Sequence, residues 1–324
     1  MITRADIAAH LEKNIRTGFL LGRKDYSPLR SAFVREVPSD GAFEDYGDMG
    51  TVPWPVQNAG KAGSGGTHSE TGAVKTNKAN SGGQIQIVGG EEKSMRIYNL
   101  DWEIAIGVTH NAIDDDRAGD LEAWARSAVL NFERHKDYVA FDALNSGEAG
   151  TNYGLAYDNN EFFDNSHIDP GAEYQTAQDN LNTLTLSLDN FETVKVAGAG
   201  FRDTRGQPLG LNHNLLIVAT ANERLAAQIS SNPQAYDTTN REMNPYSGKI
   251  TSLVAPGGWL DSTAWFLIDP NLPQKPLNLQ VRKQPELIVW DDETNGDGGT
   301  RYFKFHARYA MFYGDYRLAI QGNS

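Results

Sequence analysis

The clearest alternation of apolar and polar positions along the chain runs through WEIAIGVT, residues 102–109. Every second residue from Trp102 to Val108 is apolar, and polar or small residues stand between them. Successive side chains of a strand point to opposite faces, so this period of two predicts a half-buried strand. The same period returns in RYFKFHARYAM, residues 301–311, and predicts a second long strand.

A helical period predicts one long helix over residues 114–144. Its apolar residues follow the i, i+3, i+4, i+7, i+11 spacing of a buried helix face: Leu121, Trp124, Ala125, Ala128 and Phe132. The carboxylates at 114–116 stand where the positive end of a helix favours them, and Gly147 ends the pattern. At about 1.5 Å per residue such a helix is ~45 Å long, which indicates a structural strut.

Shorter elements complete an α+β pattern. An amphipathic helix is expected over the first twenty or so residues, and another helix at 187–196. NLLIVAT, residues 214–220, is a continuous apolar run that predicts a centrally buried strand. Thr220 and Glu223 directly after it make a T-x-x-E capping box, which predicts the start of the next helix. Further strands are expected at 265–269, 277–281 and 286–290.

A long polar stretch interrupts this pattern. GGTHSETGAVKTNKANSGG, residues 65–83, contains a single large apolar side chain, Val74. It cannot bury enough apolar surface to offset the cost of ordering its backbone, about 1–2 kcal/mol per residue. It precedes the strand-like QIQIV at 84–88, so we expect it at the tip of a hairpin-like excursion. Such an arm gains order only where another surface covers it.

Composition narrows the class of protein. The chain has 324 residues, no cysteine, and a formal charge of −13 from 42 acids and 29 scattered bases. Scattered bases on an acidic chain argue against binding of nucleic-acid phosphates. The absence of cysteine removes disulfides and thiol chemistry and fits a reducing compartment. No apolar run approaches the roughly 20 residues that span a bilayer, and no signal peptide is evident, so we expect a soluble protein without a membrane partner.

One residue pair is a candidate for catalysis. His167 and Asp169, in FFDNSHIDP, have the chemistry of a metal-binding or acid–base pair, which makes a metal-dependent hydrolase one hypothesis. The competing interpretation is a turn that Phe162 and Phe163 anchor to the core. None of the seven histidines has the H-E-x-x-H spacing, and nucleophile-elbow and phosphate-loop motifs are absent. We therefore expect no catalytic residues, no metal and no cofactor.

The acidic stretch DDETNGDGG, residues 291–299, begins like a calcium-binding loop. Its twelfth position, where the bidentate glutamate belongs, is Tyr302. A hairpin turn between two strands is the better interpretation.

Five ordered blocks resemble the Mu-like family of tailed-phage major head subunits. They are DWEIAIGVTHNAIDDDRAGDLEAWARSAVLNFERHKDYVAFDAL, FFDNSH, GQPLGLNHNLLIVATANERLAAQI, WFLIDPNLPQKPLNLQVRKQPEL and FKFHARYAMFYGDYRLAIQG. The resemblance rests on their shared order, with the aromatic, histidine-containing turn between the long helix and the Leu-Leu-Ile-Val strand. The Gly/Ser-rich segment 60–83 looks like an insertion relative to the family.

The resemblance implies an α+β, Hong Kong 97-like phage major capsid fold. The expected parts are an N-terminal arm and helix, 1–45; an extended loop, 46–109; a peripheral domain, 110–179, with its spine helix at 114–144; an axial domain, 180–268; and peripheral-domain strands with the C-terminal return, 269–324. In a closed shell a neighbouring subunit would supply the surface that the polar arm lacks.

The resemblance also implies a function. The chain is expected to be the major capsid protein of a tailed bacteriophage or prophage, assembled in the bacterial cytoplasm and located in the virion head. Its expected partners are sister copies in pentamers and hexamers, together with scaffold, portal and decoration proteins, and the shell is expected to enclose double-stranded DNA without specific binding. The predicted intersubunit contacts are Trp54, Lys61, Lys75, Lys78, Ile85, Ile87, Met95 and Trp102. A β-rich surface or adhesion module is a further alternative, which the long helix and the missing signal peptide argue against.

Overall fold

The structure is a computed structural model that describes Thr17 and residues 26–48, 93–109, 120–150, 153–169, 174–234, 243–292 and 300–322. Apart from Thr17, the predicted N-terminal helix lies outside these residues, as do the insertion at 60–83 and the predicted strand at 84–88. No helix of the described part has both the length and the apolar character needed to cross a membrane.

The first sheet has the strand order β1-β8-β9-β4. β8 (Leu277–Asp292) and β9 (Thr300–Tyr313) form a long antiparallel pair, and β4 (Leu100–Thr109) pairs antiparallel with β9. β1 (Val34–Pro38) pairs parallel with β8 at the opposite edge. The strands predicted at 102–109 and 301–311 are therefore confirmed, and they are neighbours.

β8 joins two segments that the sequence analysis separates. Residues 277–281 and 286–290 belong to one strand of 16 residues, with register shifts between Val281, Lys283 and Glu286. Pro285 lies inside this irregular stretch. Proline has no N–H to donate to the ladder, so it is tolerated in a strand at a bulge. The apolar pattern breaks there although the strand continues.

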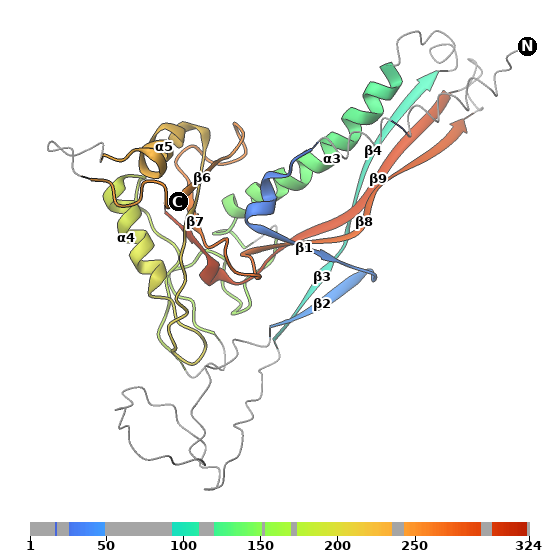
Figure 1. Ribbon diagram of the computed structural model, residues 1–324. Coiled ribbons are helices and arrows are strands. Elements are labelled where there is room, and N and C mark those ends of the chain that lie inside the picture. The colour runs from blue at the N-terminus through green and yellow to red at the C-terminus, as the bar shows by residue number, and fades with distance from the viewer. Residues whose placement is uncertain are drawn as a thin grey trace, which may run out of the picture.

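Helix α3 (Asp120–Asn145) lies along this sheet (Figure 1). Ala125, Ala128 and Phe132 are buried as predicted, but Trp124 is 54% exposed, which corrects its predicted place on the buried face. Successive helical residues differ by about 100° in direction, and Ala125 occupies the centre of the buried stripe. The helix ends one residue beyond the predicted Leu144, and its predicted start at 114 lies outside the described residues.

The second sheet has the order β10-β7-β5-β6. It consists of β5 (Leu215–Val218), β6 (Thr251–Val254), β7 (Trp265–Ile268) and β10 (Ala319–Gln321), with helices α4 (Leu188–Ala199) and α5 (Glu223–Ser231) beside it. All four residues of β5 are buried, as the apolar run predicts. β10 belongs to this second sheet. The resemblance implies instead that residues 269–324 belong with the peripheral-domain strands.

The predicted capping box at the start of α5 does not form. The hydroxyl of Thr220 donates to the carbonyl of Ala255 at 3.0 Å, and Asn222 is the N-cap residue without a side-chain cap bond. Thr220 begins a short 3₁₀ turn, Thr220–Asn222, that precedes α5. Because α5 begins only at Glu223, Thr220 is not its N-cap residue and Glu223 is not at the third helical position, as a capping box requires.

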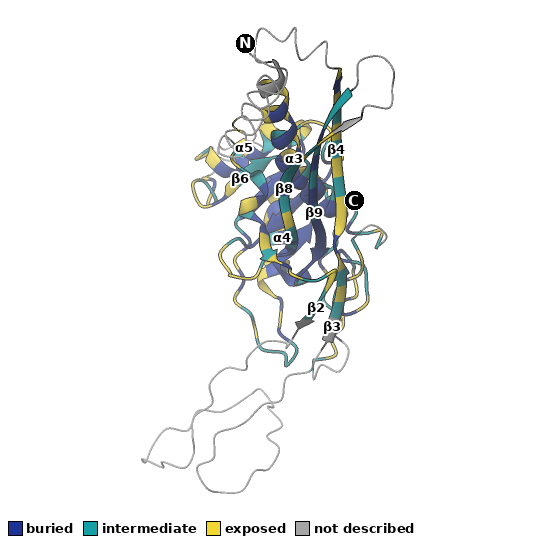
Figure 2. Ribbon diagram, turned by 90° about the vertical axis from the view of Figure 1, so that its right-hand side faces the viewer, coloured by how far each residue is buried: buried dark blue, intermediate teal, exposed yellow. Residues whose placement is uncertain are grey.

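A separate antiparallel hairpin, β2 (Phe43–Asp48) and β3 (Lys93–Tyr98), projects from the body. Figure 2 shows burial concentrated where α3 meets the first sheet, in contrast to this hairpin. Its root is fixed by buried amides: Gln280 donates to Asn99 at 2.8 Å, and Asn99 donates to the carbonyl of Gly41 at 3.0 Å. An isolated two-stranded ribbon is marginally stable, so these bonds fix where the excursion leaves the body.

Candidate functional site

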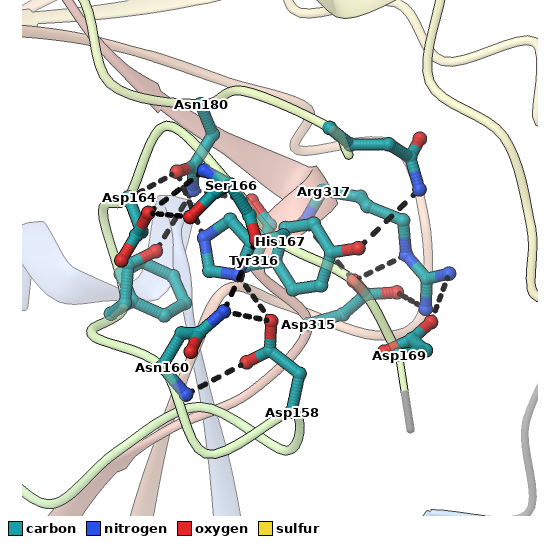
Figure 3. Close-up of polar contacts among 12 residues, drawn as sticks. Asp158, Asn160, Asp164, Ser166, His167, Asp169, Asn180, Asp315, Tyr316 and Arg317 are labelled. Carbon is teal, nitrogen blue, oxygen red and sulfur yellow. Dashed lines mark hydrogen bonds and ion pairs between the residues drawn. The ribbon is translucent and has the colours of Figure 1, made fainter. Parts of the chain in front are cut away.

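The predicted hydrolase pair does not form a catalytic site, because His167 is fully buried and faces other residues (Figure 3). Its Nδ1 lies 2.6 Å from Oδ2 of Asp158, and its Nε2 lies 3.1 Å from Oδ1 of Asn180. The ring stacks on Tyr316 at a centroid separation of 3.8 Å. A histidine held on both nitrogens and one face has no position open to a substrate or a metal.

Asn180 determines the hydrogen-bond role of Nε2 of this histidine. Its amide nitrogen contacts three carbonyl oxygens, those of Phe162, Tyr316 and Ala319, at 2.9–3.2 Å, and its oxygen accepts from the N–H of Asp164. The amide orientation is therefore determined, and the ring nitrogen facing its oxygen must donate. The network joins the turn at 158–167 to the segment at 316–319.

Asp169 belongs to a different group, the ion pair with Arg317. Its Oδ2 lies 3.4 Å from Nη1 of Arg317, which Asp315 also binds at 2.8 Å. Burial alone would lower the pKa of Arg317, but the two carboxylates raise it above its ordinary value. The described residues contain no group of three or more metal-ligating side chains. Phe162 and Phe163 are fully buried, which confirms the anchored-turn interpretation.

The β2–β3 hairpin carries the most exposed aromatic surface near the predicted extended loop. Tyr98 is 61% exposed and contacts Phe43, which is 39% exposed, at a centroid distance of 5.6 Å. The guanidinium of Arg96 lies 4.2 Å from the centre of the Phe43 ring and forms two hydrogen bonds, of 2.7 and 2.9 Å, with Asp45. This face of the hairpin therefore combines two exposed aromatic rings, Phe43 and Tyr98, with the ion pair of Arg96 and Asp45. Such a composition is typical of a protein–protein contact.

Two of the predicted contact residues fall within the described part. Met95 is half-buried and pairs with Tyr46 in the hairpin register. Trp102 is half-buried too; its Nε1 donates to the carbonyl of Tyr309 at 3.1 Å, and its ring lies 4.4 Å from that of His135. The other six, Trp54, Lys61, Lys75, Lys78, Ile85 and Ile87, lie outside the described residues, so their role stays a prediction.

Sequence reasoning did not identify the exposed aromatic residues Phe43, Tyr98 and Tyr138, and it placed the exposed Trp124 on the buried helix face. The hairpin register shows that Phe43 lies opposite Tyr98, but nothing in the sequence identifies that pairing because 54 residues separate them. Tyr138 is 40% exposed on α3, and its place 14 positions, nearly four turns, after Trp124 was a usable signal for a common helix face.

The chain is similar to phage head proteins in sequence and in structure. Residues 82–184 match the family described as Mu-like prophage major head subunit gpT. The procapsid of bacteriophage JBD30 is similar over all of this chain and 76% of its own, at 17% identity and a TM-score of 0.53. Microbacterium phage Oxtober96 is similar over 91% of this chain and 90% of its own, at 12% identity and a TM-score of 0.53. The chain matches no curated protein sequence.

The capsid of JBD30 decorated with minor capsid protein trimers is also similar, over 73% of this chain and 92% of its own, at 18% identity and a TM-score of 0.50. At such identities the likeness shows the fold alone. It confirms the predicted phage-capsid fold, and neither comparison supports the hydrolase hypothesis.

Proposed function

We propose, from its place in the Mu-like family of phage major head subunits, that this chain is the major capsid protein of a tailed bacteriophage or prophage and acts in the virion head. The observation that carries the proposal is where the family match falls. Residues 82–184 include β3, which is the second strand of the projecting hairpin, and β4 of the first sheet. They also include the long helix α3. Tyr98 of β3 and Trp124 and Tyr138 of α3 are exposed aromatic residues within this stretch, and the 26-residue helix has the length of a strut.

The sheets suggest an assignment of the shell domains. The sheet β1-β8-β9-β4 with α3 would be the peripheral domain, and the sheet β10-β7-β5-β6 with α4 and α5 the axial domain. The hairpin β2–β3 would be the base of the extended loop, and the segment before β1 the N-terminal arm. The proposed subunits form pentamers and hexamers.

The proposed partners of the shell follow from its function and its charge. Portal, scaffold and decoration proteins would bind the assembled shell; the JBD30 capsid, for comparison, carries minor capsid protein trimers. Double-stranded DNA would be enclosed without specific contacts, because the chain has a net charge of −13 and its bases are scattered along the sequence. Assembly would take place in the bacterial cytoplasm.

Electron microscopy of the purified full-length chain tests the proposal. Closed shells, or rings of five and six subunits, are the expected particles. A chain that remains monomeric at all concentrations and salt conditions tried, alone and with its scaffold, would contradict it. The chain should also cause little retardation of DNA in a gel at physiological salt.

A further inference from the structure

A small pocket opens at the root of the β2–β3 hairpin. It encloses about 190 Å³ between β1, β2, the start of β8, the end of β9 and the turn at 314–317. Pockets for drug-sized ligands have about 300–1,000 Å³. This pocket therefore has room for one side chain or a small ion, and it lies where the hairpin, the first sheet and the C-terminal segment meet.

Tyr46 lines the pocket, and its hydroxyl is the first candidate donor. Its ring stacks on Phe312 at a centroid distance of 4.6 Å, and its Oη is buried without a hydrogen-bond partner. Burial, with Glu44 nearby, raises the pKa of Tyr46, so the hydroxyl keeps its proton as a donor. An unmade buried hydrogen bond is unfavourable, so this hydroxyl is stabilised when an acceptor reaches it.

The charged residues of the lining leave a small excess of positive charge. The two acids of the pocket, Asp169 and Asp315, both bind Arg317. Arg35 is exposed and makes no ion pair with another described residue, and Lys275 donates to the carbonyl of Pro270. The pocket thus has three cations for two carboxylates. An oxyanion would satisfy the hydroxyl of Tyr46 and the charges of Arg35 and Lys275 together.

We propose that this pocket receives the carboxylate of an aspartate or glutamate side chain from a second copy of this chain. The inference rests on the proposed function. In a shell each copy is bordered by others at high effective concentration, and a chain with 42 acids and 29 bases carries carboxylates that its own bases cannot pair. The pocket is also too small for a larger ligand, and its donors match a two-oxygen acceptor.

The test compares the concentration needed for shell assembly between the wild-type chain and variants of the pocket. The double variant Arg35→Gln/Lys275→Gln should raise that concentration about tenfold or more. Tyr46→Phe, which keeps the ring stack and removes only the hydroxyl, should raise it about threefold. Lys249→Gln, a change of an exposed lysine at a distant loop, is the matched control and should have no effect. Thermal unfolding verifies that each variant folds.

Two further measurements identify the occupant. Acetate, compared with chloride at equal ionic strength, should inhibit assembly of the wild-type chain but not of the double variant. Cryo-electron microscopy of the shell should show a neighbour's carboxylate within hydrogen-bond distance of Oη of Tyr46. A pocket that faces solvent in the shell, or that binds acetate without any effect on assembly, would overturn the inference.

The two proposals fail differently. Shells of equal yield from the wild-type chain and the double variant overturn only the pocket inference. Absence of shells from the wild-type chain overturns the proposed function and this inference with it.

Discussion

Arg30 and Asp137, 107 positions apart in the chain, meet in a buried ion pair with Nη1 2.8 Å from Oδ1. The same carboxylate accepts hydrogen bonds from the hydroxyl of Tyr26 at 2.5 Å and from the N–H of Leu29 at 2.9 Å. Asp137 therefore binds the segment before β1 to the middle of α3. Because its side chain is fully buried, no water can replace these partners.

Asp137→Ala should destabilise the protein by about 3–5 kcal/mol, because it removes the fully buried carboxylate partner of the buried Arg30 guanidinium. Urea unfolding followed by tryptophan fluorescence measures the effect. Glu36→Gln is the control: its carboxylate also binds Arg30, but its side chain is 48% exposed, so the loss should stay below about 1 kcal/mol. Equal losses in the two variants would contradict the role of burial.

Asn180→Asp should destabilise the protein although the two side chains have nearly the same shape. The substitution places a carboxylate oxygen against the carbonyls of Phe162, Tyr316 and Ala319, where an N–H₂ group now donates. Loss of a buried donor costs about 1–3 kcal/mol, and repulsion adds to it. Thermal unfolding checks this, with the exposed Asn131→Asp as control, expected within about 0.5 kcal/mol of the wild-type chain.

His213 should make the protein less stable in mild acid. It is 1% exposed, its Nε2 donates to the carbonyl of Arg317 at 3.0 Å, and its Nδ1 is buried without a partner, so burial lowers its pKa. The unfolded chain takes up a proton near pH 6.5 and the folded chain only at lower pH. The contribution of His213 to the free energy of unfolding is therefore fully present above about pH 6.5. It is lost as the pH falls through the pKa of His213 in the folded chain.

The measurement is the free energy of unfolding of the wild-type chain and of His213→Asn between pH 8 and 5. The difference in the free energy of unfolding between the two chains should change with pH only below about 6.5. Below that pH the wild-type chain should lose more stability than His213→Asn. Other titrating groups contribute equally to both curves. A constant difference across the range would contradict the prediction.

Gly198→Ala should be destabilising although alanine is the better helix former by about 1 kcal/mol. Gly198 lies in α4, and an added methyl group would meet Cδ1 of Ile320 at 2.3 Å and the ring of His213 at 2.7 Å. Overpacking costs about 1–3 kcal/mol and exceeds the gain in propensity. Gly257→Ala, where the nearest atom is 4.0 Å away, is the control for thermal unfolding and should be nearly neutral.

Tyr98→Ala should reduce shell assembly without lowering the stability of the subunit. The side chain is 61% exposed, so little of its contact surface lies within its own chain. Light scattering during assembly and urea unfolding separate the two effects. Leu272→Ala, at a residue 39% exposed in another part of the chain, serves as comparison. A large loss of stability in Tyr98→Ala would mean that the tyrosine acts within the subunit.

The sequence is a good guide wherever one period of apolar residues dominates. β4, β9, β5 and α3 could be predicted because each buries one continuous stripe or a whole apolar run. Two features could not be predicted: the continuation of β8 through its interruption at Pro285, and the 3₁₀ turn before α5. Both depend on local backbone geometry that neighbouring strands determine. His167 could not be assigned to structure or catalysis from its sequence neighbours, because its partners, Asp158, Asn180 and Tyr316, come from three separate segments.

The first sheet joins segments that are distant in the sequence: among the described residues, β1 and β4 pair only with β8 and β9, which lie roughly two hundred residues further along. On the ribosome these early strands must wait until nearly the whole chain has emerged before their partners exist. Because an unpaired strand edge invites association with other chains, a nascent subunit is most exposed to aggregation late in synthesis. Any truncation before residue 300 should therefore accumulate as insoluble material.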